Sequence, residues 1–152
     1  MARVIVHLHG MPKEKANREL IEMYSKRIHS RGIRIEYHSD KLSAEAYADL
    51  LQKRKGTVIY LDEGGETLDS IEFSTRVQAW KMAGEETHLA IGPAQGWPNT
   101  KMPHDALRLS LSKMTYPHEL ASVLLVDNYT VRPRFFVEPP IIRREQRVKK
   151  CR

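Results

Sequence analysis

The stretch LRLSLSKMTYPHEL, residues 107–120, contains the local signals from which the fold can be worked out. Its first five residues predict a short strand over 107–111. The segment that follows, as far as Tyr116, is rich in serine and threonine. Pro117 suits the first turn of a helix, which we expect to run through about Asn128. A strand that leads through a polar loop into a helix is the repeating unit of α/β proteins.

The same succession of short β-rich runs and longer helical runs extends back to the N-terminus. Ser43 is a plausible N-cap for one of the helices, and Asp69 with Glu72 has the spacing of a reciprocal cap for another. The pattern predicts an α/β fold with a mainly parallel sheet and helices on both faces. The expected strands are 3–9, 33–38, 57–62 and 87–91, and the expected helices are 12–31, 43–55 and 69–84.

Length and composition indicate one globular domain. The chain has 152 residues, of which 41% are hydrophobic and 29% are charged, so it can bury a core. It contains no apolar run of about 18 residues, and its start does not read as a secretory signal, so we expect no membrane span and a cytoplasmic location. The single cysteine, Cys151, provides neither a disulfide framework nor a cysteine-based zinc site.

The net charge of +6 is concentrated at the C-terminal end of the chain. Residues 132–152 contain eight Lys and Arg against two Glu, whereas basic and acidic residues balance over 1–131. We therefore divide the chain into a domain over 1–131 and a basic tail over 132–152. Such a tail is typical of a contact with a polyanion, and the alternative is a solvated tail that keeps the protein soluble.

Glycine and hydroxyl residues gather after three of the predicted strands, in segments 61–65, 92–98 and 110–118. Ligands of open α/β sheets bind at the carboxyl ends of strands, so these three segments are expected to line one pocket. Glycine lets backbone approach a ligand closely, and the third segment offers the free N–H groups of a helix N-terminus. A flat ligand such as adenine suits this pocket. The alternative is that all three segments are ordinary turns.

Motifs of several other chemistries are absent from the sequence. It has no P-loop, no G-x-G-x-x-G after the first strand and no G-x-S-x-G elbow. His7 and His9 share one face of the first strand, but no carboxylate or cysteine stands at supporting spacing, so we expect locally hydrogen-bonded histidines and no metal site. His118 lies in the first turn of the last predicted helix, beside the pocket, where it could accept a proton or simply cap the helix.

Three segments carry more specific motifs: LDEGGETLDSIEF at 61–73, HLAIGPAQG at 88–96 and LSLSKMTYPHEL at 109–120. In this order and spacing they resemble the motifs LDxxGKxxSSExFA, F-x-IGG-x-x-G and SLSxMTLPHxLAR. These motifs belong to the RlmH family, methyltransferases of large-subunit ribosomal RNA in the SPOUT superfamily. The resemblance covers about residues 1–128.

The resemblance implies a SPOUT fold with a deep C-terminal trefoil knot that binds S-adenosylmethionine, and a homodimer. It implies that the methyl acceptor is N3 of a pseudouridine in large-subunit ribosomal RNA, recognised on the ribosome. By position it assigns cofactor contacts to Leu61, Gly92, Leu111, Ser112, Lys113, Met114, Thr115 and Tyr116.

The C-terminal segment departs from the family pattern. Thr130 and Val131 stand where the family has tyrosine and arginine, and no residue replaces its terminal histidine. Arg132 and Arg134 are candidates to replace this arginine and to place a positive charge near the nucleobase that is methylated. We expect four arginines of the tail to contact RNA: Arg132, Arg134, Arg143 and Arg144.

Three functions remain open after the sequence analysis. The first is the ribosomal RNA methyltransferase that the resemblance implies. The second is a knotted relative that binds RNA or ribosomes without turnover. The third is a methyltransferase that acts on a different RNA.

Overall fold

The computed structural model describes the backbone of residues 4–137 and the side chains of residues 4–127. The strands are β1 (Val4–His9), β2 (Ile33–His38), β3 (Thr57–Thr67), β4 (Thr87–Ala90) and β5 (Leu107–Ser110). The helices are α1 (Lys15–His29), α2 (Ala44–Gln52), α3 (Ser70–Met82) and α4 (His118–Val137), with a 3-10 turn η1 (Asn99–Lys101).

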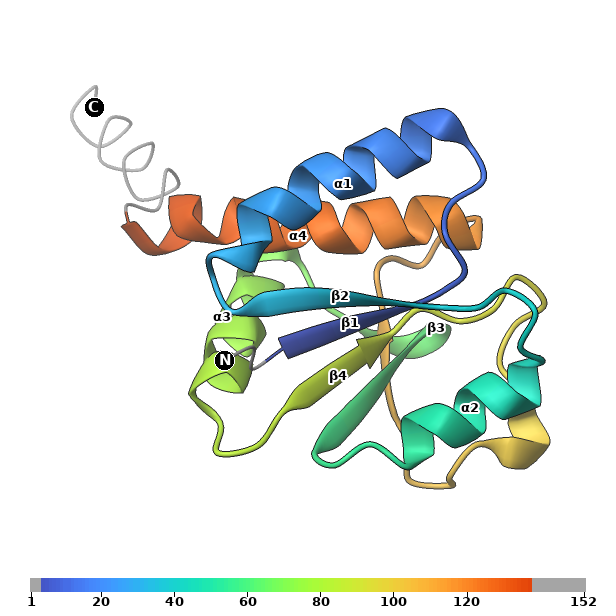
Figure 1. Ribbon diagram of the computed structural model, residues 1–152. Helices are drawn as coiled ribbons and strands as arrows, with labels where there is room; N and C mark the ends of the chain where they lie inside the picture. Colours follow the sequence, from blue (N-terminus) through green and yellow to red (C-terminus); the bar gives the residue numbers. More distant parts are fainter. Residues whose placement is uncertain (1–3, 138–152) are drawn as a thin grey trace.

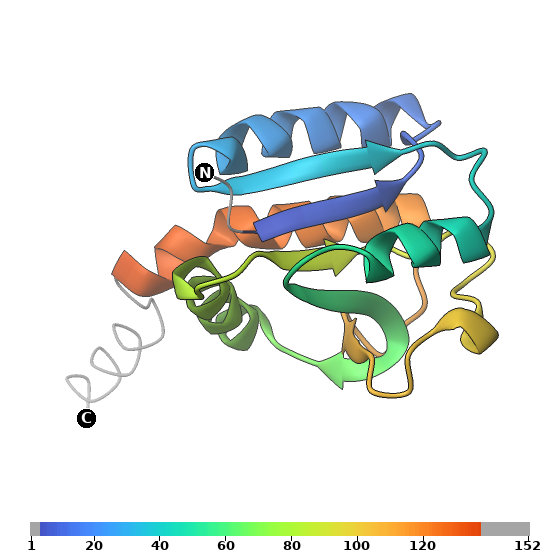
Figure 2. The same ribbon diagram turned by 60° about the horizontal axis from the view of Figure 1, so that its bottom comes forward.

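The five strands form one parallel sheet in the order β2-β1-β4-β3-β5 (Figures 1 and 2). β3 pairs with β4 on one side and with β5 on the other. Helices α1 and α4 lie side by side over one face, together with α3, and α2 covers the other face (Figure 1). The prediction of an α/β fold with a parallel sheet and helices on both faces is confirmed. Within the described residues, none of the helices has the length and apolar character needed to cross a membrane.

The two faces of the sheet bury different cores. On one face, Ile21 of α1, Val77 of α3 and Leu125 of α4 pack against apolar side chains of the strands. On the other face, Tyr47 and Leu51 of α2 form a smaller apolar cluster with Tyr60 of β3 and Ala90 of β4. The α2 face therefore has less apolar surface to bury, and it is the face that accepts polar side chains.

Histidines occupy this α2 face because alternate residues of β1 point to opposite sides of the sheet. His7 is fully buried and lies between His38 of β2 and His88 of β4. Burial, helped by these two neighbours, lowers the pKa of His7 to about 3, so its ring is neutral at pH 7. His9 bonds through Nε2 to the carbonyl of Leu42 at 2.8 Å. His7 and His9 are therefore hydrogen-bonded as predicted, but their partners are distant in the sequence rather than local.

Two elements extend further than the sequence predicts. β3 continues to Thr67, because after a register shift it returns to β5 and pairs Glu66 with Leu109. Gly65 permits this return, since a Cβ there would lie 2.6 Å from the backbone of Arg108. The last helix continues past Asn128 to Val137, in a segment that has no glycine to end it.

Helix starts are fixed by polar side chains. The hydroxyl of Ser43 accepts a hydrogen bond from the Ala46 amide at the start of α2, as expected. The carboxylate of Asp69 accepts one from the Glu72 amide at 2.7 Å at the start of α3.

The N-terminus of α1 has no side-chain cap from its own N-cap residue, and a carboxylate of α4 binds the amides there instead. The carboxylate of Glu119 accepts hydrogen bonds from the amides of Lys13 and Glu14, at 2.6 and 3.4 Å, and from the Asn17 side chain at 3.2 Å. The Lys13 amide is the main cause that lowers the pKa of Glu119 below its ordinary value. This carboxylate therefore links the starts of two helices that are distant in the sequence.

We expect Glu119→Ala to lower the free energy of unfolding by about 1 kcal/mol at pH 7, because two amides lose a charged acceptor. Because the pKa of Glu119 is lower in the folded protein than in the unfolded chain, the ionised carboxylate stabilises the fold above pH 4.5, its ordinary pKa. This stabilisation is lost as the pH falls through the lowered pKa of the folded state. Urea denaturation at pH 7 and pH 3 measures the effect. Glu22→Ala, at an exposed position of α1, is the control. An equal loss for Glu119→Ala at both pH values would contradict an ionic link.

Candidate functional site

A cavity of about 610 Å³ lies at the carboxyl ends of β3, β4 and β5. Its volume is within the range of about 300–1,000 Å³ that is typical of small-molecule sites. Parallel pairing brings these strand ends to one edge of the sheet, so the three loops that follow them meet there. The expected single pocket is therefore present. The lining residues are 61–63, 91–97, 109–112, 114–118 and 121.

The loop after β4 forms one wall of the cavity around Trp97. The indole Nε1 of Trp97 donates a hydrogen bond to the Leu61 carbonyl at 2.8 Å, which ties this loop to β3. The Trp97 ring packs edge-on against Tyr60 and Tyr47, with ring centroids 5.0 and 5.5 Å apart. A Cβ on Gly92 would lie 3.0 Å from the Trp97 nitrogen. The wall is thus fixed by packing, and a side chain at Gly92 would require the Trp97 ring to shift by a few tenths of an ångström.

The loop after β5 is shaped by its own hydroxyl groups. Ser110 donates from Oγ to the Ser112 carbonyl at 2.6 Å, and the Oγ of Ser112 accepts from the Met114 amide at 2.9 Å. The Thr115 hydroxyl donates to the carboxylate of Glu63, which joins this loop to the loop after β3. These hydroxyls therefore hold the loop in shape.

An ion pair and a histidine border the cavity. Arg108 of β5 forms an ion pair with Asp62, which the sequence analysis did not anticipate because the two residues meet only through the β3–β5 pairing. His118, half-buried in the first turn of α4, lines the cavity. Burial lowers the pKa of His118, so its imidazole is neutral at pH 7 and able to accept a proton.

The structure brings most of the predicted cofactor residues together. Lys113 lies in the loop after β5 but is not among the residues that line the cavity. The side chains of Arg132 and Arg134, and all of Arg143 and Arg144, lie outside the described residues, so their predicted roles stay predictions. The predicted residues that line the cavity are Leu61, Gly92, Leu111, Ser112, Met114, Thr115 and Tyr116.

Comparisons with known proteins point to one family. A family model described as "Predicted SPOUT methyltransferase" matches residues 2–129. The chain is 35% identical over 137 residues to ribosomal RNA large subunit methyltransferase H of Ruminiclostridium cellulolyticum, which covers 78% of this chain and 85% of that protein. It is 30% identical over 141 residues to the protein of the same name from Kosmotoga olearia, with 80% and 87% covered.

The similarity to other relatives is higher but shorter. The chain is 41% identical over 86 residues to ribosomal RNA large subunit methyltransferase H of Cereibacter sphaeroides, which covers 55% of this chain and 56% of that protein. The match thus spans little more than half the length of that relative. The family model extends from the start of β1 into α4 and so contains all the loops that line the cavity. The chain belongs to the SPOUT methyltransferase family, which confirms the resemblance seen in its sequence.

Proposed function

We propose that the protein is an S-adenosylmethionine-dependent methyltransferase of large-subunit ribosomal RNA, and that its target atom is N3 of a pseudouridine. The observation that carries the proposal is the cavity formed jointly by the three loops that contain the family motifs. The printed names of the relatives support ribosomal RNA as the substrate class. The proposal takes the ribosome as the partner and the cytoplasm as the location.

The cavity fits S-adenosylmethionine in size and in chemistry. Its walls combine apolar side chains such as Leu61 and Trp97 with backbone groups of the loop around Gly92, which suits a flat adenine ring. Leu111, Ser112 and residues 114–116, which line the cavity, would hold the rest of the cofactor. When bound, the cofactor supplies an already activated methyl group. The work of the protein is therefore to align donor and acceptor and to exclude water.

The cofactor proposal predicts that Gly92→Ala weakens S-adenosylmethionine binding at least about tenfold, because the new Cβ meets Trp97 and displaces the wall. Calorimetry measures this against the wild type, for which we expect a micromolar Kd. Gly84→Ala is the matched control, since a Cβ on Gly84 meets no atom within 4 Å. If Gly92→Ala bound S-adenosylmethionine as tightly as the wild type does, the wall at Gly92 would not be part of the cofactor site. If the wild type did not bind S-adenosylmethionine, the proposed methyltransferase activity would be contradicted.

The N3–H of a uracil ring is weakly acidic, so its methylation needs a proton acceptor or a nearby positive charge. We assign the acceptor to His118, whose neutral imidazole faces the cavity. Arg132 and Arg134, near the end of α4, are the candidates for the positive charge.

His118→Gln is expected to reduce kcat by about 10²-fold and to leave cofactor affinity unchanged, because it removes the proton acceptor but keeps a polar side chain. The lowered pKa of His118 predicts a wild-type rate that is flat above pH 6.5, its ordinary value, and falls only in more acid solution. The kcat and the pH dependence of the rate are measured as methyl transfer to large ribosomal subunits isolated from cells that lack the gene. Mass spectrometry then locates the methyl group.

The same assay separates the three functions that the sequence leaves open. A new methyl group on a large-subunit pseudouridine supports the proposal. A methyl group on another RNA supports a different target. RNA binding with no transfer to any RNA supports a relative without turnover, which the substitutions at Thr130 and Val131 would explain.

A trefoil knot and a homodimer are part of the proposal. β5 lies at the sheet edge beside β3, and α4 then returns across the molecule to pack on α1 and α3, a path that supports a threaded chain (Figure 2). Exposed apolar side chains on α1, on α4 and in the loop that precedes α1 support a dimer formed through the face of the molecule that α1 and α4 cover. They are Met11, Leu20, Met23 and Leu120.

The basic tail is proposed to bind RNA. Truncation after Val137 removes Arg143 and Arg144 with four further Lys and Arg, and it leaves α4 complete. We expect the truncated protein to lose RNA affinity by at least about tenfold, with a shallower salt dependence, because fewer phosphates are neutralised. Cofactor affinity should stay the same. Electrophoretic or fluorescence binding assays at two salt concentrations test this, and undiminished RNA affinity would contradict the role of the tail.

A further inference from the structure

A row of three histidine rings crosses the sheet on its α2 face, away from the cavity. His7 Nδ1 lies 2.8 Å from His38 Nε2, and His7 Nε2 lies 2.9 Å from His88 Nδ1. His7 and His88 are completely buried. An apolar side chain would fill such core positions without any need for hydrogen-bond partners, so the row calls for a functional explanation.

The hydrogen bonds of the row determine which ring nitrogens carry protons. The Lys55 carbonyl only accepts, so His88 Nε2, at 3.0 Å from it, is the donor there. In the tautomer in which His88 Nδ1 accepts, His7 Nε2 is the donor at 2.9 Å, and the neutral His7 ring has its lone pair on Nδ1. That lone pair faces His38. A histidine whose second nitrogen donates to a fixed acceptor is typical of a metal ligand, because the donated bond sets its tautomer and orientation.

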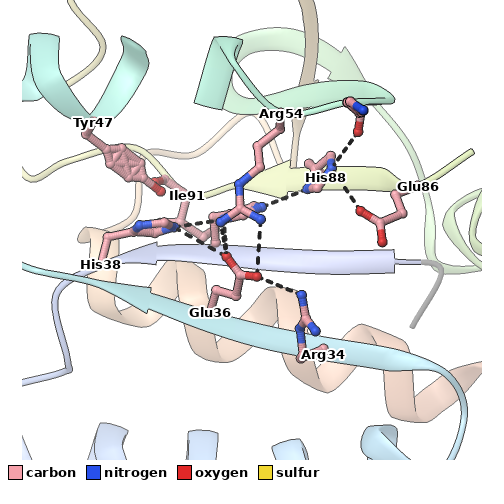
Figure 3. Close-up of polar contacts among 10 residues, drawn as sticks. Arg34, Glu36, His38, Tyr47, Arg54, Glu86, His88 and Ile91 are labelled. Carbon is pink, nitrogen blue, oxygen red and sulfur yellow. Dashed lines mark hydrogen bonds and ion pairs between the residues drawn. The ribbon is translucent and has the colours of Figure 1, made fainter. Parts of the chain in front are cut away.

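A carboxylate completes the group. Glu36 of β2 lies with its Oε2 3.6 Å from His7 Nδ1 and 4.0 Å from His38 Nε2. Arg54 and Arg34 hold this carboxylate in place, with nitrogen–oxygen distances of 2.5 and 2.7 Å (Figure 3). Glu36 stands two residues before His38 on the same strand, so both side chains point to the same face.

We propose that His7, His38 and Glu36 form a binding site for a divalent transition-metal ion of the zinc class. The three ligand atoms lie 2.8, 3.6 and 4.0 Å from one another. Tetrahedral zinc with bonds of about 2.0–2.1 Å places its ligand atoms about 3.3–3.5 Å apart, so shifts of about half an ångström suffice. The metal takes the place of the proton between His7 and His38, and His38 moves its own proton to Nδ1.

The surroundings favour zinc, nickel or copper over magnesium or calcium. Two imidazole nitrogens and one carboxylate suit the borderline metals, whereas magnesium and calcium require oxygen ligands. The guanidinium of Arg54 beside Glu36 repels any divalent cation, so the bonds to the two imidazoles would have to supply most of the affinity. His38 and Glu36 remain partly exposed, with 14% and 22% of their side chains accessible, so water can reach the fourth position of a tetrahedral ion.

The test uses the untagged full-length protein after removal of metals with a chelator. Titration with zinc sulfate in a calorimeter should show one Zn²⁺ per chain with a Kd of about 1 µM or tighter. His38→Ala and Glu36→Gln should each weaken binding about tenfold to hundredfold. These partly exposed positions are chosen because substitution of buried His7 would open the core. His29→Ala, at an exposed histidine of α1, is the control and should bind as the wild type does.

Cobalt(II) gives an independent readout, since a tetrahedral ion with nitrogen ligands has visible absorption bands that His38→Ala should abolish. Circular dichroism and S-adenosylmethionine titration establish that each variant is folded. The site is overturned if the wild type binds no zinc at millimolar concentration, or if His38→Ala or Glu36→Gln keeps the wild-type affinity. Because the metal ligands do not line the cavity, failure of this proposal leaves the proposed methyl transfer untouched.

Discussion

The parallel pairing of β3 with two partners is the constraint on which the rest of the structure depends. β3 holds β4 on one side and β5 on the other, although both follow it in the chain. The carboxyl ends of the three strands therefore meet at one edge, and the loops that follow them are tied across β3. Trp97 bonds to the Leu61 carbonyl, and Thr115 bonds to Glu63. The cavity is thus a consequence of strand order.

The sequence predicts those features whose causes are local. The apolar run of each strand and the polar residues before α2 and α3 place these elements to within a few residues of their bounds, except at the end of β3. Ser43 and Asp69 cap helices as their spacing predicts, because a cap involves only the next three residues. The loops at the cavity were also identified, since glycine and hydroxyl residues mark them and parallel strands bring them to one edge.

Features that depend on distant pairing could not be predicted. Glu119 holds the amide of Lys13 across 106 residues of sequence, and no local pattern indicates such a contact. The extension of β3 requires that Gly65 meet the backbone of β5, which depends on strand order. For the same reason the approach of Glu36 to His7 was not expected: this carboxylate comes from the neighbouring strand and not from any position near His7 in the chain.

The histidine row and the cavity are connected through one side chain of α2. The hydroxyl of Tyr47 donates to the Ile91 carbonyl at 2.9 Å, directly before Gly92 of the cavity wall, and burial keeps the hydroxyl protonated by raising its pKa. The Tyr47 ring lies 5.4 Å from His38 and 5.5 Å from Trp97, edge-on to both. Packed interiors transmit displacement because they contain few voids. Tyr47 of α2 therefore supports the cavity wall through Ile91 and Trp97, and its ring also packs against the row of histidines.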